Sequence, residues 1–216
     1  MNYPVICRAV LLVITLSACG ASKAPAQVTP TTPADSNAVN ALPPAGYGQF
    51  NQDAITLRLR SGPLEIRVVP LDERVLRLLS PDGYRSLRQL IDANQPRIDS
   101  IADRANVREP GIALVSFFAI TPGTRFDPNL LFVTQRNQLL RPIGVIPLSP
   151  AMSAQQLDVG TQATGLFLLE DLIPVTEQFS ISYLGATAND WERRLSRLDA
   201  ERSRIRGRVG NNEGTP

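Results

Sequence analysis

The stretch IALVSFFAI, from Ile112 to Ile120, decides the fold. Eight of its nine residues are apolar, and β-branched and aromatic side chains dominate. This pattern is typical of a β-strand that is covered on both faces. Pro110-Gly111 marks a turn directly before it.

Two shorter strands are expected before this stretch. Period-two alternation of apolar and polar residues indicates half-buried strands, and a turn between two such runs indicates a hairpin. The alternation occurs on either side of Ser61-Gly62-Pro63, with apolar residues at Ile55, Leu57 and Leu59 and then at Leu64, Ile66 and Val68.

A helical insertion is expected between the second and third strands, at about residues 71–106. The run from Leu71 to Leu79 fits a short helix, and Ser80-Pro81-Asp82 opens a second one. Pro96 is expected to break or kink this second helix. The apolar residues of the second helix and its continuation are Tyr84, Leu87, Leu90, Ile91, Ile98, Ile101 and Ala105.

Strand patterns return after Ile120, at residues 130–134, 139–148, 165–169 and 179–183. Pro142 and Pro147 interrupt the second of these, which suggests an edge position because proline cannot donate to a ladder. About seven short strands with turn signals between most of them favour an antiparallel β-sandwich.

A C-terminal amphipathic helix is expected over residues 187–209. Thr187-Ala188-Asn189-Asp190 offers a capping box, and one apolar stripe follows it. Three interpretations stay open: the stripe packs on the domain, it pairs with another helix, or the arginine face rests on anionic lipid or polymer. The candidate partner-binding residues are Trp191, Leu195, Leu198, Arg202 and Ile205.

The composition argues against catalysis. The chain has no histidine, and its two cysteines, Cys7 and Cys19, lie at the extreme N-terminus. We therefore expect no thiol nucleophile, disulfide, metal or cofactor site in the domain. The formal charge of +2 offers no field for nucleic acid.

Two acidic pairs are the remaining catalytic candidates, Glu170-Asp171 and Asp72-Glu73. Adjacent residues of a strand point to opposite faces, so neither pair forms a two-carboxylate site. Asp72-Glu73 suits the start of a helix, where acids complement the dipole. We expect a protein that is not an enzyme.

The first eighteen residues have the order of a secretory signal. Arg8 precedes the apolar run Ala9 to Leu16, which is far shorter than the ~20 residues of a membrane-spanning helix. Leu16-Ser17-Ala18-Cys19 follows and resembles the lipobox of bacterial lipoproteins. That resemblance implies cleavage between Ala18 and Cys19 and a lipid on Cys19. Gly20 favours the outer membrane, facing the periplasm, over the inner membrane.

Residues 20 to about 46 are rich in Pro, Ala, Thr and Ser and lack an apolar period. We expect a disordered tether with a reach of roughly 30 Å. The expected organisation is a signal peptide (1–18), lipidated cysteine and tether (19–47), a sandwich domain (48–186), the helix (187–209) and a disordered tail (210–216).

Three segments carry a second resemblance: Arg141-Pro142 through Ile146-Pro147, Gly165-Leu166-Phe167, and Phe179 to Tyr183. They resemble the immunoglobulin-like domains of unassigned function found in many bacterial lipoproteins. The Cys…Trp…Cys core of antibody domains is absent, because Trp191 lies beyond the last strand. The expected fold class is α+β: an immunoglobulin-like antiparallel β-sandwich with a helical insertion and a C-terminal amphipathic helix.

The function expected from these features is that of a membrane-anchored cell-envelope lipoprotein with a structural or protein-binding role. Its partners would be the membrane, through the lipid on Cys19, and another envelope protein. The alternative is a module that binds envelope polysaccharide or a small ligand. An aromatic-lined groove would favour that alternative, and a buried Trp191 would count against it.

Overall fold

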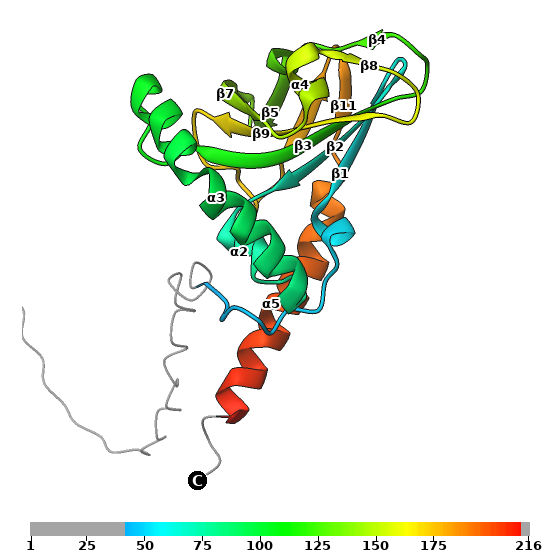
Figure 1. The fold of residues 1–216 in the computed structure, drawn as a ribbon. Coiled ribbons are helices and arrows are strands. Elements are labelled where there is room, and N and C mark those ends of the chain that lie inside the picture. Colours follow the sequence, from blue (N-terminus) through cyan, green and yellow to red (C-terminus); the bar gives the residue numbers. More distant parts are fainter. Residues whose placement is uncertain (1–41, 213–216) are drawn as a thin grey trace, which may run out of the picture. The chain divides into compact units, whose positions relative to one another are not determined.

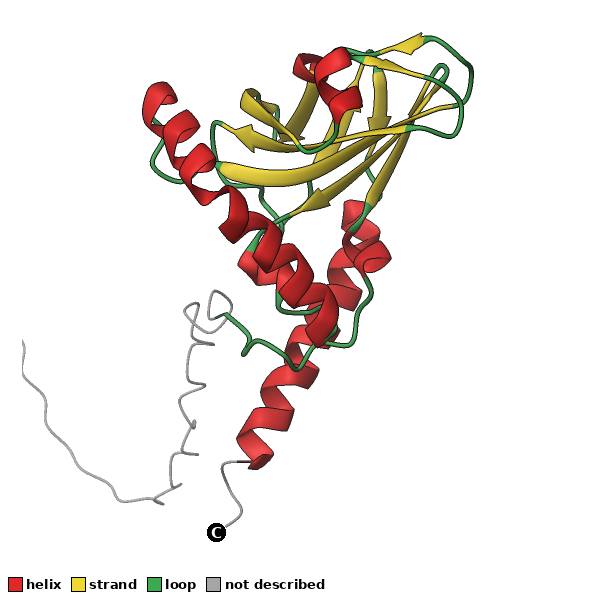
Figure 2. Ribbon diagram, viewed as in Figure 1, coloured by secondary structure: helices red, strands yellow, loops and turns green. Residues whose placement is uncertain are grey.

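The computed structural model describes residues 42–212, which combine helices with antiparallel sheets (Figures 1 and 2). A five-stranded sheet has the order β1-β2-β3-β9-β7, a four-stranded sheet has the order β11-β10-β5-β6, and β4 pairs with β8. The strands are β1 (Leu57–Ser61), β2 (Leu64–Pro70), β3 (Gly111–Ala119), β4 (Thr124–Arg125), β5 (Leu131–Gln135), β6 (Gln138–Leu140), β7 (Pro142–Pro147), β8 (Gln156–Leu157), β9 (Gln162–Leu169), β10 (Ser180–Tyr183) and β11 (Ala186–Ala188).

Helices flank these sheets, and a helix ends the described part of the chain (Figure 2). No helix in the described part is long and apolar enough to cross a membrane. The helical elements are η1 (Gln52–Ile55), α2 (Glu73–Leu76), α3 (Pro81–Ala105), η2 (Pro128–Leu130), α4 (Pro150–Ala154) and α5 (Trp191–Asn212).

The expected central strand is confirmed as β3, the middle strand of the five-stranded sheet. Its neighbours are β2 and β9, with Val115 opposite Val68 on one side and Gly165 on the other. Alternate residues of β3 are fully buried and the others are half-buried, so the second face is covered only in part. The β1–β2 hairpin is also confirmed, with Ser61 opposite Leu64.

The strand expected over 139–148 is two strands in different sheets. β6 pairs with β5, whereas β7 pairs with β9, and the chain changes sheets at Arg141. Proline at position 142 has no N–H to continue the first ladder. Both strands are edges of their sheets, as the prolines suggested.

The four-stranded sheet contains a strand that the sequence pattern missed. β11 pairs with β10 through Ile181 and Ala188, where a helix start was expected, and α5 begins at Trp191. A tight turn with positive φ at Leu184 and Gly185 joins β10 to β11. Three residues are too few for alternation to be recognisable.

One apolar core receives side chains from both sheets. The ring of Phe117 on β3 stacks on Phe126 at 4.5 Å and meets Tyr183 of β10 edge-on at 5.8 Å. The immunoglobulin-like arrangement is not confirmed. In immunoglobulin domains the second and third strands lie in opposite sheets, whereas here β2 and β3 pair.

The insertion is dominated by α3, one uninterrupted helix of 25 residues. Pro96 does not break it. This residue is exposed, so the carbonyl that loses its amide partner can bind water. The helix packs beside β7, where a Cβ on Gly144 would lie 2.7 Å from Ile101 Cγ2. Glycine at this position therefore sets how closely α3 approaches the sheet.

Candidate binding surfaces

The apolar stripe of α5 packs on the chain's own domain, the first of the three interpretations. Trp191 is fully buried, donates its indole N–H to the Val175 carbonyl at 3.2 Å, and lies 4.9 Å from the Phe179 ring. Leu198, Arg202 and Ile205 are also buried, and Leu195 is half-buried. A partner of α5 would have to contact its other faces.

A segment that we call the strap, residues 43–55, runs antiparallel along α5. Arg204 Nη2 donates to the Tyr47 carbonyl at 3.0 Å, and Glu201 Oε1 accepts from the Gln49 amide at 2.9 Å. Farther along, Arg194 Nη1 donates to the carbonyls of Asp53 and Ala54 at 2.9 and 3.0 Å. Earlier residues of the strap thus meet later residues of the helix.

The strap also lies flat against the segment between α2 and α3. The Phe50 amide donates to the Leu78 carbonyl at 3.1 Å, and the Ser80 amide donates to the Phe50 carbonyl at 2.8 Å. A Cβ on Gly48 would lie 2.3 Å from the Leu78 carbonyl, so only glycine fits. Within the described residues the strap already contacts the domain at Pro43, whose carbonyl accepts from Arg77.

Two charged side chains of α5, Glu201 and Arg202, are buried. The side-chain hydrogen bond from Arg204 lowers the pKa of Glu201, and burial opposes this shift. Arg202 pairs with Asp199 through Nη1, and its Nη2 is buried without a partner among residues 42–208. Arg202, one of the candidate partner-binding residues, is therefore a buried charged residue within the apolar stripe of α5.

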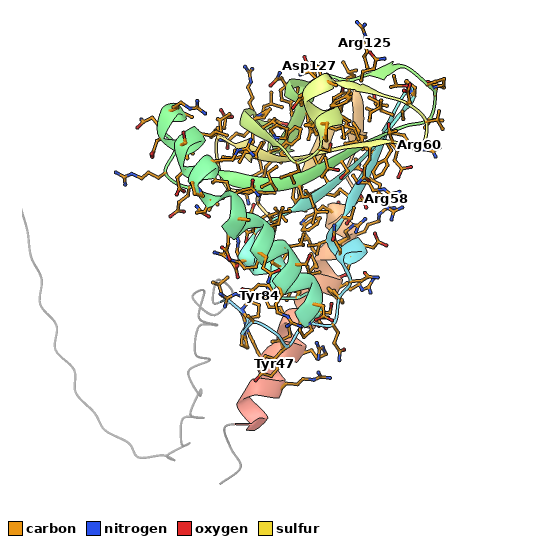
Figure 3. All side chains as sticks on the ribbon, in the orientation of Figure 1. Tyr47, Arg58, Arg60, Tyr84, Arg125 and Asp127 are labelled. Atoms are coloured by element: carbon orange, nitrogen blue, oxygen red, sulfur yellow. The ribbon has the colours of Figure 1, made fainter. Side chains whose placement is uncertain are left out.

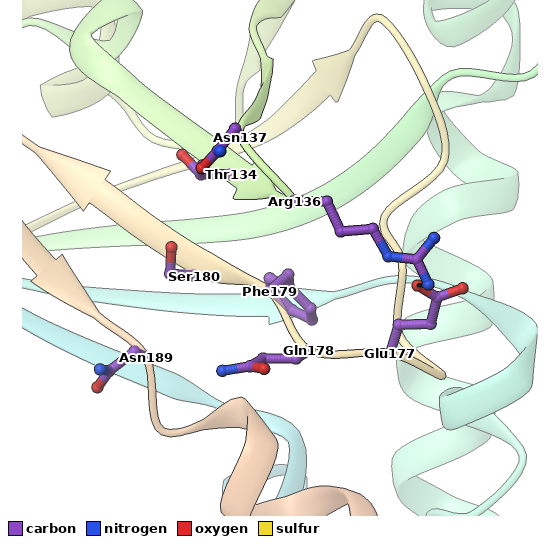
Figure 4. A pocket seen from close by; sticks show the side chains of 8 residues that line it. All are labelled: Thr134, Arg136, Asn137, Glu177, Gln178, Phe179, Ser180 and Asn189. Atoms are coloured by element: carbon purple, nitrogen blue, oxygen red, sulfur yellow. Dashed lines mark ion pairs between the residues drawn. The ribbon is translucent and has the colours of Figure 1, made fainter.

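A polar pocket of about 500 Å³ opens beside β5 and β10 (Figure 4). We call it the sheet pocket. The Arg136–Glu177 ion pair, at 2.7 Å, forms one wall, and the buried Phe179 contributes to the lining. Hydroxyl and amide groups supply the rest of its hydrogen-bonding chemistry, from Thr134, Asn137, Gln178, Ser180 and Asn189. It holds a single carboxylate, so it lacks the acid–base pair that glycoside hydrolysis needs.

We use the name apolar tip for three exposed apolar residues that lie in separate loops: Ile120, Val159 and Leu184, exposed to 48%, 57% and 65%. They are the most exposed large apolar side chains in the described part. The Gly123 amide binds Asp158 at 2.9 Å and so ties the first two loops together. The third follows Tyr183, whose hydroxyl accepts from the Asp127 amide at 3.0 Å.

The apolar tip and the strap lie at opposite ends of the domain. Arg125 and Asp127 mark the end with the tip, and Tyr47 marks the end where the strap meets α5 (Figure 3). Burial raises the pKa of the Tyr183 phenol, which therefore stays neutral beside Asp127. The described chain thus begins at one end of the domain, and its apolar loops are exposed at the other end.

The two acidic pairs have structural partners. Asp72 caps α2 and accepts from the Arg74 amide at 2.8 Å, which confirms the helix start expected there. Within residues 42–208 no cluster of acidic, histidine or cysteine side chains could hold a metal ion. The partners are Arg74 for Asp72, Arg77 and Arg88 for Glu73, the Arg141 amide for Glu170 and the Leu172 amide for Asp171.

Cys19 and Ala18, the expected lipidation and cleavage residues, lie outside the described residues. No family model, curated protein or solved structure matches the chain. Its function is therefore inferred from its residues and surfaces.

Proposed function

We propose that the chain is a lipid-anchored lipoprotein of the cell envelope whose sandwich-like domain binds another envelope protein without catalysing a reaction. The lipobox-like sequence ending at Cys19 supports the anchor. It also supports the outer membrane, on the periplasmic side, as the location, because Gly20 follows the cysteine.

The observation that carries the binding role is the separation of the two ends of the domain (Figure 3). Twenty-two residues, 20–41, connect Cys19 to the described chain, and they span at most about 70–80 Å when fully extended. The tether joins the domain through the strap. The apolar tip lies at the other end of the domain, where it is free to contact a partner in the periplasm.

The chemistry of the tip suits a protein partner. A partner that removes apolar side chains on loop ends from water stabilises the complex by about 25 cal/mol for each Å² of apolar surface buried. Exposed arginines at the same end, Arg60 and Arg125, offer hydrogen bonds at the rim of such a contact. This combination is typical of the centre and rim of a protein interface.

The anchor is tested by replacing the cysteines one at a time. Cys19→Ala should abolish incorporation of labelled palmitate and release the protein from membranes in a carbonate wash. Cys7→Ala is the matched control and should leave both unchanged. If the Cys19→Ala protein stays wholly with the membranes, the lipobox assignment fails.

The binding role is tested by crosslinking the acylated chain in intact cells. Serine at Ile120, Val159 and Leu184 together should reduce the crosslinked partner at least tenfold, because the apolar contact is removed. Leu172→Ser is the control, since Leu172 is similarly exposed but lies away from the tip. An unchanged crosslinking pattern in the triple variant would exclude the tip as the interface.

The sheet pocket supports a second candidate, a module that binds polysaccharide or a small polar ligand. Its hydroxyl and amide groups match a hydroxyl-rich ligand. The buried Trp191 counts against it, because no tryptophan is available to stack on a sugar. Retention of the protein on envelope polysaccharide, lost in Thr134→Val and Ser180→Val, would favour this candidate over protein binding.

A further inference from the structure

A second pocket lies between the strap and the first turns of α5. Its volume is about 490 Å³, and it is lined mostly by polar and charged side chains. The lining residues that matter for its charge are Asp53, Asp190, Arg193, Arg194 and Arg197.

The negative charges of this pocket are already matched. Asp190 pairs with Arg194 at 2.6 Å, and Asp53 pairs with Arg58 at 3.0 Å. Arg194 Nη1 also donates hydrogen bonds to two carbonyls of the strap. Arg194 therefore positions the wall of the pocket and has few N–H donors left for a ligand. The two aspartates and Arg194 therefore have a structural role in the pocket.

Arg193 and Arg197 are the remaining charges. Both are exposed, and neither makes an ion pair or a side-chain hydrogen bond within the described part of the chain. They are four residues apart on α5, so they lie on the same helix face. The guanidinium of Arg197 lies over the Phe50 ring, 4.8 Å from its centroid. Stacking holds that group by its face and leaves its in-plane N–H donors free.

We propose that this pocket binds a phosphate group. Arginine forks match phosphate oxygens in bidentate geometry, and two uncompensated positive charges balance the roughly −1.5 to −2 of a phosphate monoester. The strap wall, Arg194 and Phe50 are fixed by the fold, so the site needs little ordering before it binds. The volume leaves room for the group that carries the phosphate.

A phosphate can belong to a soluble molecule or to a lipid headgroup, and two probes distinguish them. The full chain with Cys19→Ala is titrated with inorganic pyrophosphate by calorimetry. The same protein is cosedimented with vesicles of 30% phosphatidylglycerol in phosphatidylcholine and with vesicles of phosphatidylcholine alone. Binding to pyrophosphate alone assigns a soluble ligand, and binding to the anionic vesicles alone assigns a headgroup.

Arg193→Gln and Arg197→Gln should each weaken binding to the responding probe at least tenfold. Arg97→Gln is the matched control, because Arg97 is exposed on α3 and has no ion pair in the described residues. Fluorescence of Trp191 checks that each variant is folded. The proposal is overturned if neither probe binds, or if Arg97→Gln weakens binding as much as the α5 variants.

Discussion

Gly48→Ala tests whether the strap is part of the folded domain. The new Cβ would lie 2.3 Å from the backbone carbonyls of Leu78 and Leu79. A backbone group cannot rotate away as a side-chain end can, so the strap must move away from the backbone of Leu78 and Leu79. The φ of Gly48 is not in the left-handed region, and the predicted effect is therefore purely steric.

The size of the effect follows from the hydrogen bonds beside Gly48. Lifting the strap removes the Phe50–Leu78 and Ser80–Phe50 backbone bonds and the bond from the Gln49 amide. At about 1 kcal/mol each, the loss is about 3 kcal/mol. For a domain of this size this lowers Tm by about 6–12 °C.

Urea unfolding monitored by the fluorescence of the single tryptophan measures the loss, and hydrogen exchange at the Phe50 and Ser80 amides locates it. Gly207→Ala on α5 is a control of opposite sign. A Cβ there meets nothing within 4 Å, so it should raise stability by up to about 1 kcal/mol. If Gly48→Ala keeps wild-type stability and amide protection, the described packing of the strap against the segment between α2 and α3 is wrong.

Three further results are expected. Trp191→Ala should cost about 3–5 kcal/mol in calorimetric unfolding, because it empties a fully buried site, and a cost below 1 kcal/mol would contradict the packing of α5. Tyr183→Phe leaves the Asp127 amide without its acceptor and should cost about 1–2 kcal/mol in urea unfolding, whereas a neutral change would mean that water replaces the hydroxyl. The folded-state pKa of Glu201 is lowered below its ordinary value of 4.5, so its stabilising effect is complete above that pH and is lost as the pH falls through the lowered pKa. As the pH is lowered, the free energy of unfolding should therefore fall less steeply in Glu201→Gln than in the wild-type protein. Identical slopes in the two proteins would exclude this contribution.

Periodicity predicted the long elements well. The β1–β2 hairpin, the central strand and the C-terminal helix each repeat their pattern over enough residues to be recognised. The stripe of α5 could not reveal what it packs against, because intramolecular and intermolecular contacts require the same spacing. Burial of Trp191 settles this for the described domain.

The missed features have a common physical cause. Strands such as β11 and β8 contain three or two residues and depend on their partners for their shape. The strap binds mainly through backbone groups, which carry no side-chain signal, although Gly48 and the arginines of α5 are visible in the sequence. Among the candidate sites, Arg193 and Arg197 were recognised only as part of an arginine face, because their separation from carboxylates depends on tertiary structure.

The direction of the strap has a mechanical consequence. Because the strap runs antiparallel to α5, tension applied at residue 42 along the helix axis, toward its C-terminal end, loads the bonds to Tyr47, Gln49, Asp53 and Ala54 together, in shear. Bonds loaded in parallel share the force, whereas a perpendicular pull would break them one at a time, like a zipper. The strap is thus arranged to resist a force that is transmitted through the residues preceding it.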